Sequence, residues 1–126
     1  MRNALVLMVL ATGCETGGGG GSVTVDAAPD TPAVPVMALS SCPSTVAADV
    51  IDSPTAFIPK DSTISIGQVV RFTITAEHFV IPNTLKTTDQ ALMVSRGQTK
   101  CFKFNVAGTY NFLCGVHSFP GSIIVQ

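Results

Sequence analysis

The chain has 126 residues, a formal net charge of −1 at pH 7, 46% hydrophobic residues and 12% charged residues. This length suits one folded domain, and the apolar content supports a buried core, which excludes a wholly disordered chain. Because basic residues are not in excess, we expect no nucleic-acid partner.

The first residues of the chain have the pattern of an export signal. Arg2 is followed by an apolar run over residues 4–11 and by small residues before Cys14. The segment resembles a bacterial lipoprotein signal, which implies cleavage after residue 13 and acylation of Cys14, although Ala11 stands where such signals usually carry Leu. An ordinary secretory signal is the alternative. A bilayer needs about 20 apolar residues, so we expect attachment to the bacterial cell envelope only through lipid.

The next part of the chain has the composition of a tether. An unbroken glycine run over residues 17–21 is followed by spaced prolines, and no hydrophobic periodicity accompanies them. Glycine-rich chains are flexible and proline-rich chains are stiffer. We therefore predict a signal peptide over residues 1–13, a disordered tether over 14–40 and one folded domain over 41–126.

The predicted domain shows the alternation of short β-strands. Residues 69–75 alternate between apolar and mostly polar side chains, which gives the strand one apolar face. Residues 101–104 and 109–113 alternate in the same way around a turn, and we interpret them as a β-hairpin. Residues 122–125 suit a buried closing strand. Since no longer window has a helical period, we expect an all-β sandwich with Greek-key connections.

Reactive side chains gather where the strand over residues 109–113 ends. Its alternation continues to Cys114 on the inward face, and His117 follows three residues later. His78 is the only other histidine of the sequence and stands between two predicted strands. One thiolate and two imidazoles form the trigonal donor set of blue-copper centres. These three residues are therefore candidate copper ligands.

Three stretches of the sequence resemble the cupredoxin family, in particular its plastocyanin, amicyanin and pseudoazurin group. They are SIGQVVRFTITAEHFV, GTYNFLCGVH and GSIIVQ, and the resemblance covers roughly residues 54–126. It implies a cupredoxin-like fold and one copper ion bound by His78, Cys114 and His117. It also implies an electron carrier, not an enzyme, that passes one electron between transient redox protein partners outside the cytoplasm. We expect a monomer.

One position departs from the pattern of the family. In amicyanin a methionine three residues after the second histidine is the weak axial ligand, but here that residue is Pro120, and all four methionines precede His117. We expect a three-coordinate site or a long contact from the backbone carbonyl of Glu77. Met93 is another axial candidate, although the apolar run around it is more simply explained as core.

The four cysteines can be assigned together. With Cys14 acylated and Cys114 bound to copper, Cys42 and Cys101 remain for one disulfide, which suits an exported protein. The alternation of its strand places Cys101 on the face away from the main core. Two free thiols are the alternative.

Other functions of Cys114 and the histidines stay open as alternatives. A copper chaperone or scavenger would use the same three ligands, and a metal-free interaction domain would only pack them. A Cys–His nucleophile would not need His78 and lacks an accompanying oxyanion-hole motif. Structural zinc prefers four ligands. A c-type haem is excluded because the sequence has no Cys-x-x-Cys-His motif.

Overall fold

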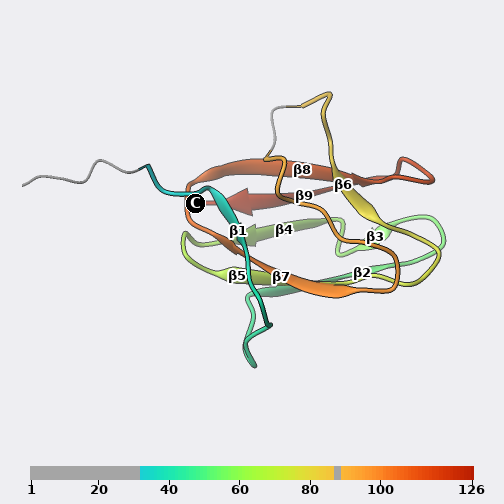
Figure 1. The fold of residues 1–126 in the computed structure, drawn as a ribbon. Helices are drawn as coiled ribbons and strands as arrows, with labels where there is room; N and C mark the ends of the chain where they lie inside the picture. Colours follow the sequence, from blue (N-terminus) through green and yellow to red (C-terminus); the bar gives the residue numbers. More distant parts are fainter. Residues whose placement is uncertain (1–31, 87–88) are drawn as a thin grey trace, which may run out of the picture. The chain divides into compact units, whose positions relative to one another are not determined.

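The structure, a computed structural model, describes residues 32–86 and 89–126, and all regular elements of these residues are β-strands. No helix that could span a bilayer occurs among them. Residues 33–126 form one unit, shown in Figure 1. The expected signal peptide, most of the expected tether and Cys14 lie outside the described residues.

The strands form two sheets that pack face to face (Figure 1). The first sheet has the order β1-β7-β5-β2-β3, with bounds Val36–Ala38, Thr99–Phe104, Val69–Thr73, Ala48–Asp52 and Phe57–Ile58. The second has the order β4-β9-β8-β6, with bounds Asp61–Ile64, Pro120–Val125, Gly108–Cys114 and Val80–Pro82. The pairs β2–β5 and β4–β9 are parallel, and the other pairs are antiparallel. The expected all-β Greek-key sandwich is confirmed.

Alternating burial along the strands builds the core between the sheets. In β5 Val70 and Phe72 are fully buried, while Val69, Arg71 and Thr73 are not. The Phe72 ring contacts Phe102 in its own sheet and Phe112 in the opposite sheet, with centroids 5.7 and 5.2 Å apart. Burial of each large apolar side chain stabilises the fold by about 1.5–3 kcal/mol. This aromatic cluster therefore holds the two sheets together.

The β-hairpin predicted from residues 101–104 and 109–113 is wrong. The strands β7 and β8 exist, but β7 pairs with β1 and β5, whereas β8 pairs with β6 and β9. The turn between them carries the chain from one sheet to the other. At this corner the Tyr110 hydroxyl donates to the Val106 carbonyl at 2.7 Å, and the Tyr110 ring packs on Phe104. Alternation identifies a half-buried strand but not its neighbour, because strands in either sheet have one buried face.

The sandwich also begins before the predicted boundary at residue 41. β1 lies within the segment assigned to the tether, yet it pairs antiparallel with β7 and buries Val36. The Asn105 side chain donates to the Val34 carbonyl at 3.0 Å and holds the chain just before β1. A short strand at a sheet edge tolerates a neighbouring proline such as Pro35. The proline-rich composition therefore suggested a tether where the structure has β1.

A disulfide fastens the segment after β1 to the sheet. Cys42 and Cys101 are joined, with a Cα–Cα distance of 5.3 Å. Cys101 is fully buried in β7 but does not belong to the main hydrophobic cluster that contains Phe102 and Phe104. The backbone N–H of Leu39 donates to the Cys101 carbonyl at 2.9 Å. The bridge thus covers the outer face of β7 with the chain that leads to β2.

Replacing Cys42→Ala should lower the free energy of unfolding by about 4 kcal/mol, because the bridge closes a loop with a sequence separation of 59. Urea unfolding of the oxidised wild type and the variant measures the difference. A reducing agent should lower the free energy of unfolding of the wild type to that of the variant, and it should leave the value of the variant unchanged. Equal stability of the two oxidised proteins would contradict a stabilising bridge.

Candidate metal centre

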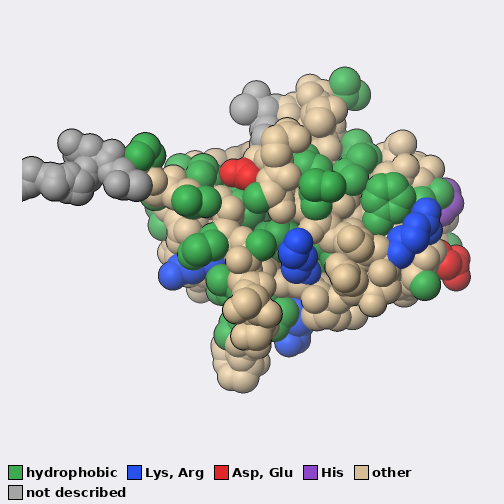
Figure 2. Space-filling view, viewed as in Figure 1, with side chains coloured by type: hydrophobic (Ala, Val, Ile, Leu, Met, Phe, Trp, Pro, Cys, Tyr) green, Lys and Arg blue, Asp and Glu red, His purple; other side chains and the backbone are tan. Residues whose placement is uncertain are grey.

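The structure brings together the three residues that the sequence suggested as metal ligands. His78 lies in the connection from β5 to β6, Cys114 ends β8, and His117 lies in the loop between β8 and β9. Their potential ligand atoms all lie within 4.8 Å of one another. His78 and Cys114 are buried and His117 is exposed. Figure 2 shows histidine, in purple, at the right-hand edge of the molecule.

Backbone hydrogen bonds hold Cys114 and His117 in a tight loop. The Cys114 N–H donates to the Phe119 carbonyl at 2.9 Å, and the Ser118 N–H donates to the Cys114 carbonyl at 2.8 Å. Ser118 has a φ of 60°, a left-handed conformation that costs a non-glycine residue about 1–2 kcal/mol. The loop places Cys114 Sγ 4.0 Å from His117 Nδ1. Local strain at Ser118 thus accompanies the approach of the thiol to the imidazole.

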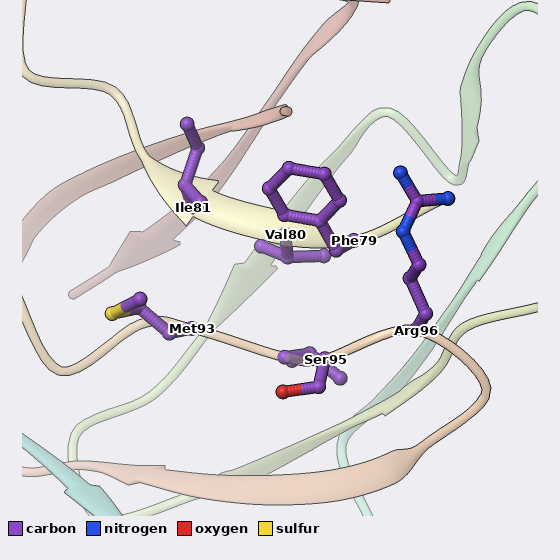
Figure 3. Close-up of a pocket in the computed structure, with 7 residues that line it drawn as sticks. Phe79, Val80, Ile81, Met93, Ser95 and Arg96 are labelled. Atoms are coloured by element: carbon purple, nitrogen blue, oxygen red, sulfur yellow. The ribbon is translucent and has the colours of Figure 1, made fainter. Parts of the chain in front are cut away.

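The ring of Phe79 packs on the backbone of this loop. The Gly115 N–H donates to the Phe79 carbonyl at 3.0 Å, and a Cβ at Gly115 would lie only 2.0 Å from the Phe79 ring. The Arg96 guanidinium also lies over this ring, 5.1 Å from its centroid, as Figure 3 shows. A residue with a side chain at position 115 would therefore displace the ring or the loop.

A buried carboxylate contacts the first histidine. The Asp52 side chain is 1% exposed, and its Oδ2 pairs with Nδ1 of His78, whose side chain is 4% exposed. Thr75 adds its backbone N–H to Oδ1 at 3.0 Å and its hydroxyl to Oδ2 at 2.6 Å. Burial raises the pKa of Asp52, but the hydrogen bonds from Thr75 and His78 outweigh this effect and hold the pKa below its ordinary value. Asp52 is therefore an ionised group beside His78.

Sequence reasoning missed Asp52. It precedes His78 by 26 positions, and no local motif connects them. The one available signal was the place of Asp52 at the end of a strand with apolar neighbours, which does not reveal its partner.

One aromatic ring, that of Phe119, lies against both imidazoles. The Phe119 ring lies 5.4 Å from the His78 ring and 6.1 Å from the His117 ring, stacked parallel to the latter. The two imidazoles are 5.0 Å apart. Phe119 in turn packs on Phe57, with centroids 4.8 Å apart. These contacts link the two imidazoles to the aromatic core.

The axial donors suggested by the sequence have other surroundings. The Glu77 carbonyl already accepts a hydrogen bond from Arg96 Nη1 at 2.8 Å. Met93 is 50% exposed and lines a surface pocket of about 410 Å³ with residues such as Phe79 and Arg96 (Figure 3). Leu92 and Val94 on either side are core, but Met93 itself is not, because the alternation turns it outward. The structure thus gives no support to Met93 as a ligand.

Comparison with known proteins supports the fold. No family model matches the sequence, and no curated protein matches it either. The oxidised form of a proline-to-alanine variant of amicyanin matches with a TM-score of 0.60 and 19% identity, over 74% of this chain and 100% of that one. The chain has the cupredoxin fold. Amicyanin from Paracoccus versutus matches this fold with a TM-score of 0.56 and 18% identity, over 73% of this chain and 98% of its own.

A side chain at position 115 should disturb the cupredoxin fold at the candidate centre. Gly115→Ala should destabilise the metal-free protein by about 1–3 kcal/mol, because the new Cβ would overlap the Phe79 ring. Urea unfolding measures the loss. The double change Gly115→Ala with Phe79→Leu should recover part of it, since a smaller side chain makes room. An unchanged unfolding midpoint in Gly115→Ala would show that the loop does not depend on this packing.

Proposed function

We propose that the protein is a blue-copper electron carrier that binds one copper ion through Cys114, His78 and His117. The observation that carries this proposal is the convergence of one thiol and two imidazoles, with potential ligand atoms within 4.8 Å. Thiolate and imidazole ligands in a trigonal set are the donors of blue-copper centres. One of the similar amicyanin structures is of a Cu(I) form, which agrees with this choice of metal.

The donor set fits copper better than structural zinc. Structural zinc sites have four protein ligands. In the part of the chain that the structure describes, the candidate metal centre brings together three histidine, cysteine or acidic residues. One of them, Cys114, is a buried free cysteine. The carboxylate of Asp52 is engaged by Thr75 and His78. The residues present therefore suit a three-ligand copper centre.

Fixed ligands favour a carrier over a copper chaperone or a metal-free interaction domain. His78 is held by Asp52, and the loop of Cys114 is closed by two backbone hydrogen bonds. Ligands that are held in place need little rearrangement when the charge of a bound ion changes by one. A chaperone must instead release its ion, which fixed and buried ligands oppose.

Copper, when bound, would supply one-electron redox chemistry. The protein would supply the path by which an electron passes between the copper and a partner protein. His78 and Cys114 hold the interior side of the centre, while His117 is exposed to solvent. Val116 next to it is 44% exposed and adds apolar surface. Small interfaces suit brief encounters with redox partners. We therefore propose that electrons pass through the edge of the His117 ring to transient protein partners, without an enzymatic reaction.

Addition of Cu(II) to the full-length protein should produce an intense thiolate-to-copper absorption band that disappears and returns on reversible one-electron reduction. Cys114→Ser should abolish the band, because it removes the thiolate. Met93→Leu is the matched control and should keep it, since Met93 lies outside the ligand group. A band and a copper content unchanged in Cys114→Ser would refute the site. Loss of copper on reduction would favour a chaperone instead.

We further propose that the protein works outside the cytoplasm, tethered to the bacterial cell envelope through acylated Cys14. The disulfide between Cys42 and Cys101 supports export, because such bridges persist in oxidising compartments. Mass spectrometry of the native protein should find an N-terminus at Cys14 that carries acyl chains. A mature chain that retains residues 1–13, or that begins at Cys14 without lipid, would contradict the anchor.

A further inference from the structure

The chain enters the sandwich at the end that lies opposite the candidate metal centre. The Asn105 backbone N–H donates to the Pro35 carbonyl at 2.9 Å, so the start of β1 lies at the turn between β7 and β8. This turn leads to Gly108, and β8 then runs about 20 Å to Cys114. The chain that leads into β1 is at the left in Figure 1, and histidine is at the right-hand edge in the same view in Figure 2.

Apolar side chains are exposed around this point of entry. Val34 is 58% exposed, Ile66 is 55% exposed and Val106 is 37% exposed. Their segments are neighbours, because the Gly67 N–H donates to the Phe104 carbonyl at 2.6 Å and the residue after Phe104 donates to the Val34 carbonyl. We call Val34, Ile66 and Val106 the apolar end. Single exposed apolar side chains are common, whereas a group of them indicates an interaction surface.

The segments that form the apolar end carry no charged side chain. Residues 33–35, 65–68 and 105–107 are apolar, glycine or uncharged polar residues. The uncharged segment 43–47 lies beside them and lines, together with residues 67–69, a surface pocket of about 320 Å³. The charged residue nearest to this end along β7 is Lys103. The surface therefore offers apolar contacts to a partner and few ionic ones.

The proposed lipid anchor favours the bilayer as the partner of the apolar end. Only a short stretch of chain separates Cys14 from the first described residues, and these residues join the sandwich beside Val34. A short linker keeps the point of attachment at a high effective concentration near the anchor. Contact with a bilayer interface strengthens with the apolar area that it buries, and it needs no charge on the protein when the lipid is neutral.

A second copy of the chain fits the apolar end less well. A stable protein–protein interface buries roughly 800 Å² on each partner, which three partly exposed aliphatic side chains cannot supply. A tethered domain, in contrast, needs only a weak contact to take up a preferred orientation, because the tether has already brought it to the lipid.

We propose that the apolar end rests on the surface of the bilayer that carries the anchor, so that the candidate metal centre points away from the lipid. This inference rests on the proposed acylation of Cys14 and does not depend on copper binding. It also restricts the redox partner. Because His117 is then at the end of the domain farthest from the bilayer, the partner is a soluble protein or a domain that projects well beyond the membrane surface.

The first test measures which end of the native, metal-free, full-length protein lies near lipid. The nitrogen-15-labelled protein is bound to phosphatidylcholine nanodiscs that carry a gadolinium chelate on some headgroups. The paramagnetic relaxation of the Ile66 and Val106 amides should be enhanced several-fold more than that of the Val116 and His117 amides. Equal enhancement at both ends would show that the domain turns freely on its tether, and greater enhancement at His117 would reverse the orientation. Either result would overturn the proposal.

A pair of substitutions separates contact by the apolar end from the effect of the tether alone. Ile66→Asp should abolish the difference in relaxation between the two ends, because it places a charge where the apolar end meets lipid. Met93→Asp is the matched control at a half-exposed residue outside the apolar end, and it should keep the difference. If Ile66→Asp keeps the difference as well, the point of attachment alone orients the domain and the proposed contact is wrong.

Two further outcomes would overturn this proposal while the copper centre stands or falls by its own absorption band. A native protein that carries no acyl chain and does not bind the nanodiscs would exclude lipid as the partner. A wild type that sediments as a dimer in the absence of lipid, together with a monomeric Ile66→Asp variant, would identify a second copy of the chain as the partner instead.

Discussion

The packing of Phe72 against Phe112 joins the two sheets, and the geometry of the candidate centre depends on it. Phe72 lies in β5, whose continuation carries Thr75 and His78, and Phe112 lies in β8 two residues before Cys114. Residues two apart on a strand share a face, so Phe112 and Cys114 both point inward. His78 also leads into β6, whose Val80 pairs with Cys114 in the second sheet, so this strand pairing and the contact between the sheets together place the first histidine near the thiol. A stable core and an organised centre are the same requirement here.

The centre combines a fixed interior with one exposed ligand. Asp52 and Thr75 tie His78 to the first sheet, and the loop hydrogen bonds tie Cys114 to the second. His117 is the member of the group that reaches solvent. Such a division suits electron transfer, because the interior ligands can keep their positions while a partner approaches the exposed ring. This arrangement requires a buried carboxylate at Asp52 and a left-handed backbone at Ser118, and both features oppose folding.

Sequence reasoning succeeded where a local pattern has one structural meaning. Alternation over residues 69–75 identified a strand, and the same alternation carried through to Cys114. It failed where structure depends on distant partners. The pairing of β7 with β5 in place of β8, and the contact of Asp52 with His78, are set by sheet topology, which period-two patterns do not encode. The outward direction of Met93 was missed because a short apolar run suggested core.

X-ray absorption at the copper edge of the loaded protein would identify the atoms bound to the metal. We expect one short sulfur bond and two imidazole nitrogens in both oxidation states, with little change in bond lengths on reduction. A first shell made only of nitrogen and oxygen would show that Cys114 does not bind copper. A shell that changes its number of ligands on reduction would contradict a centre built from fixed ligands.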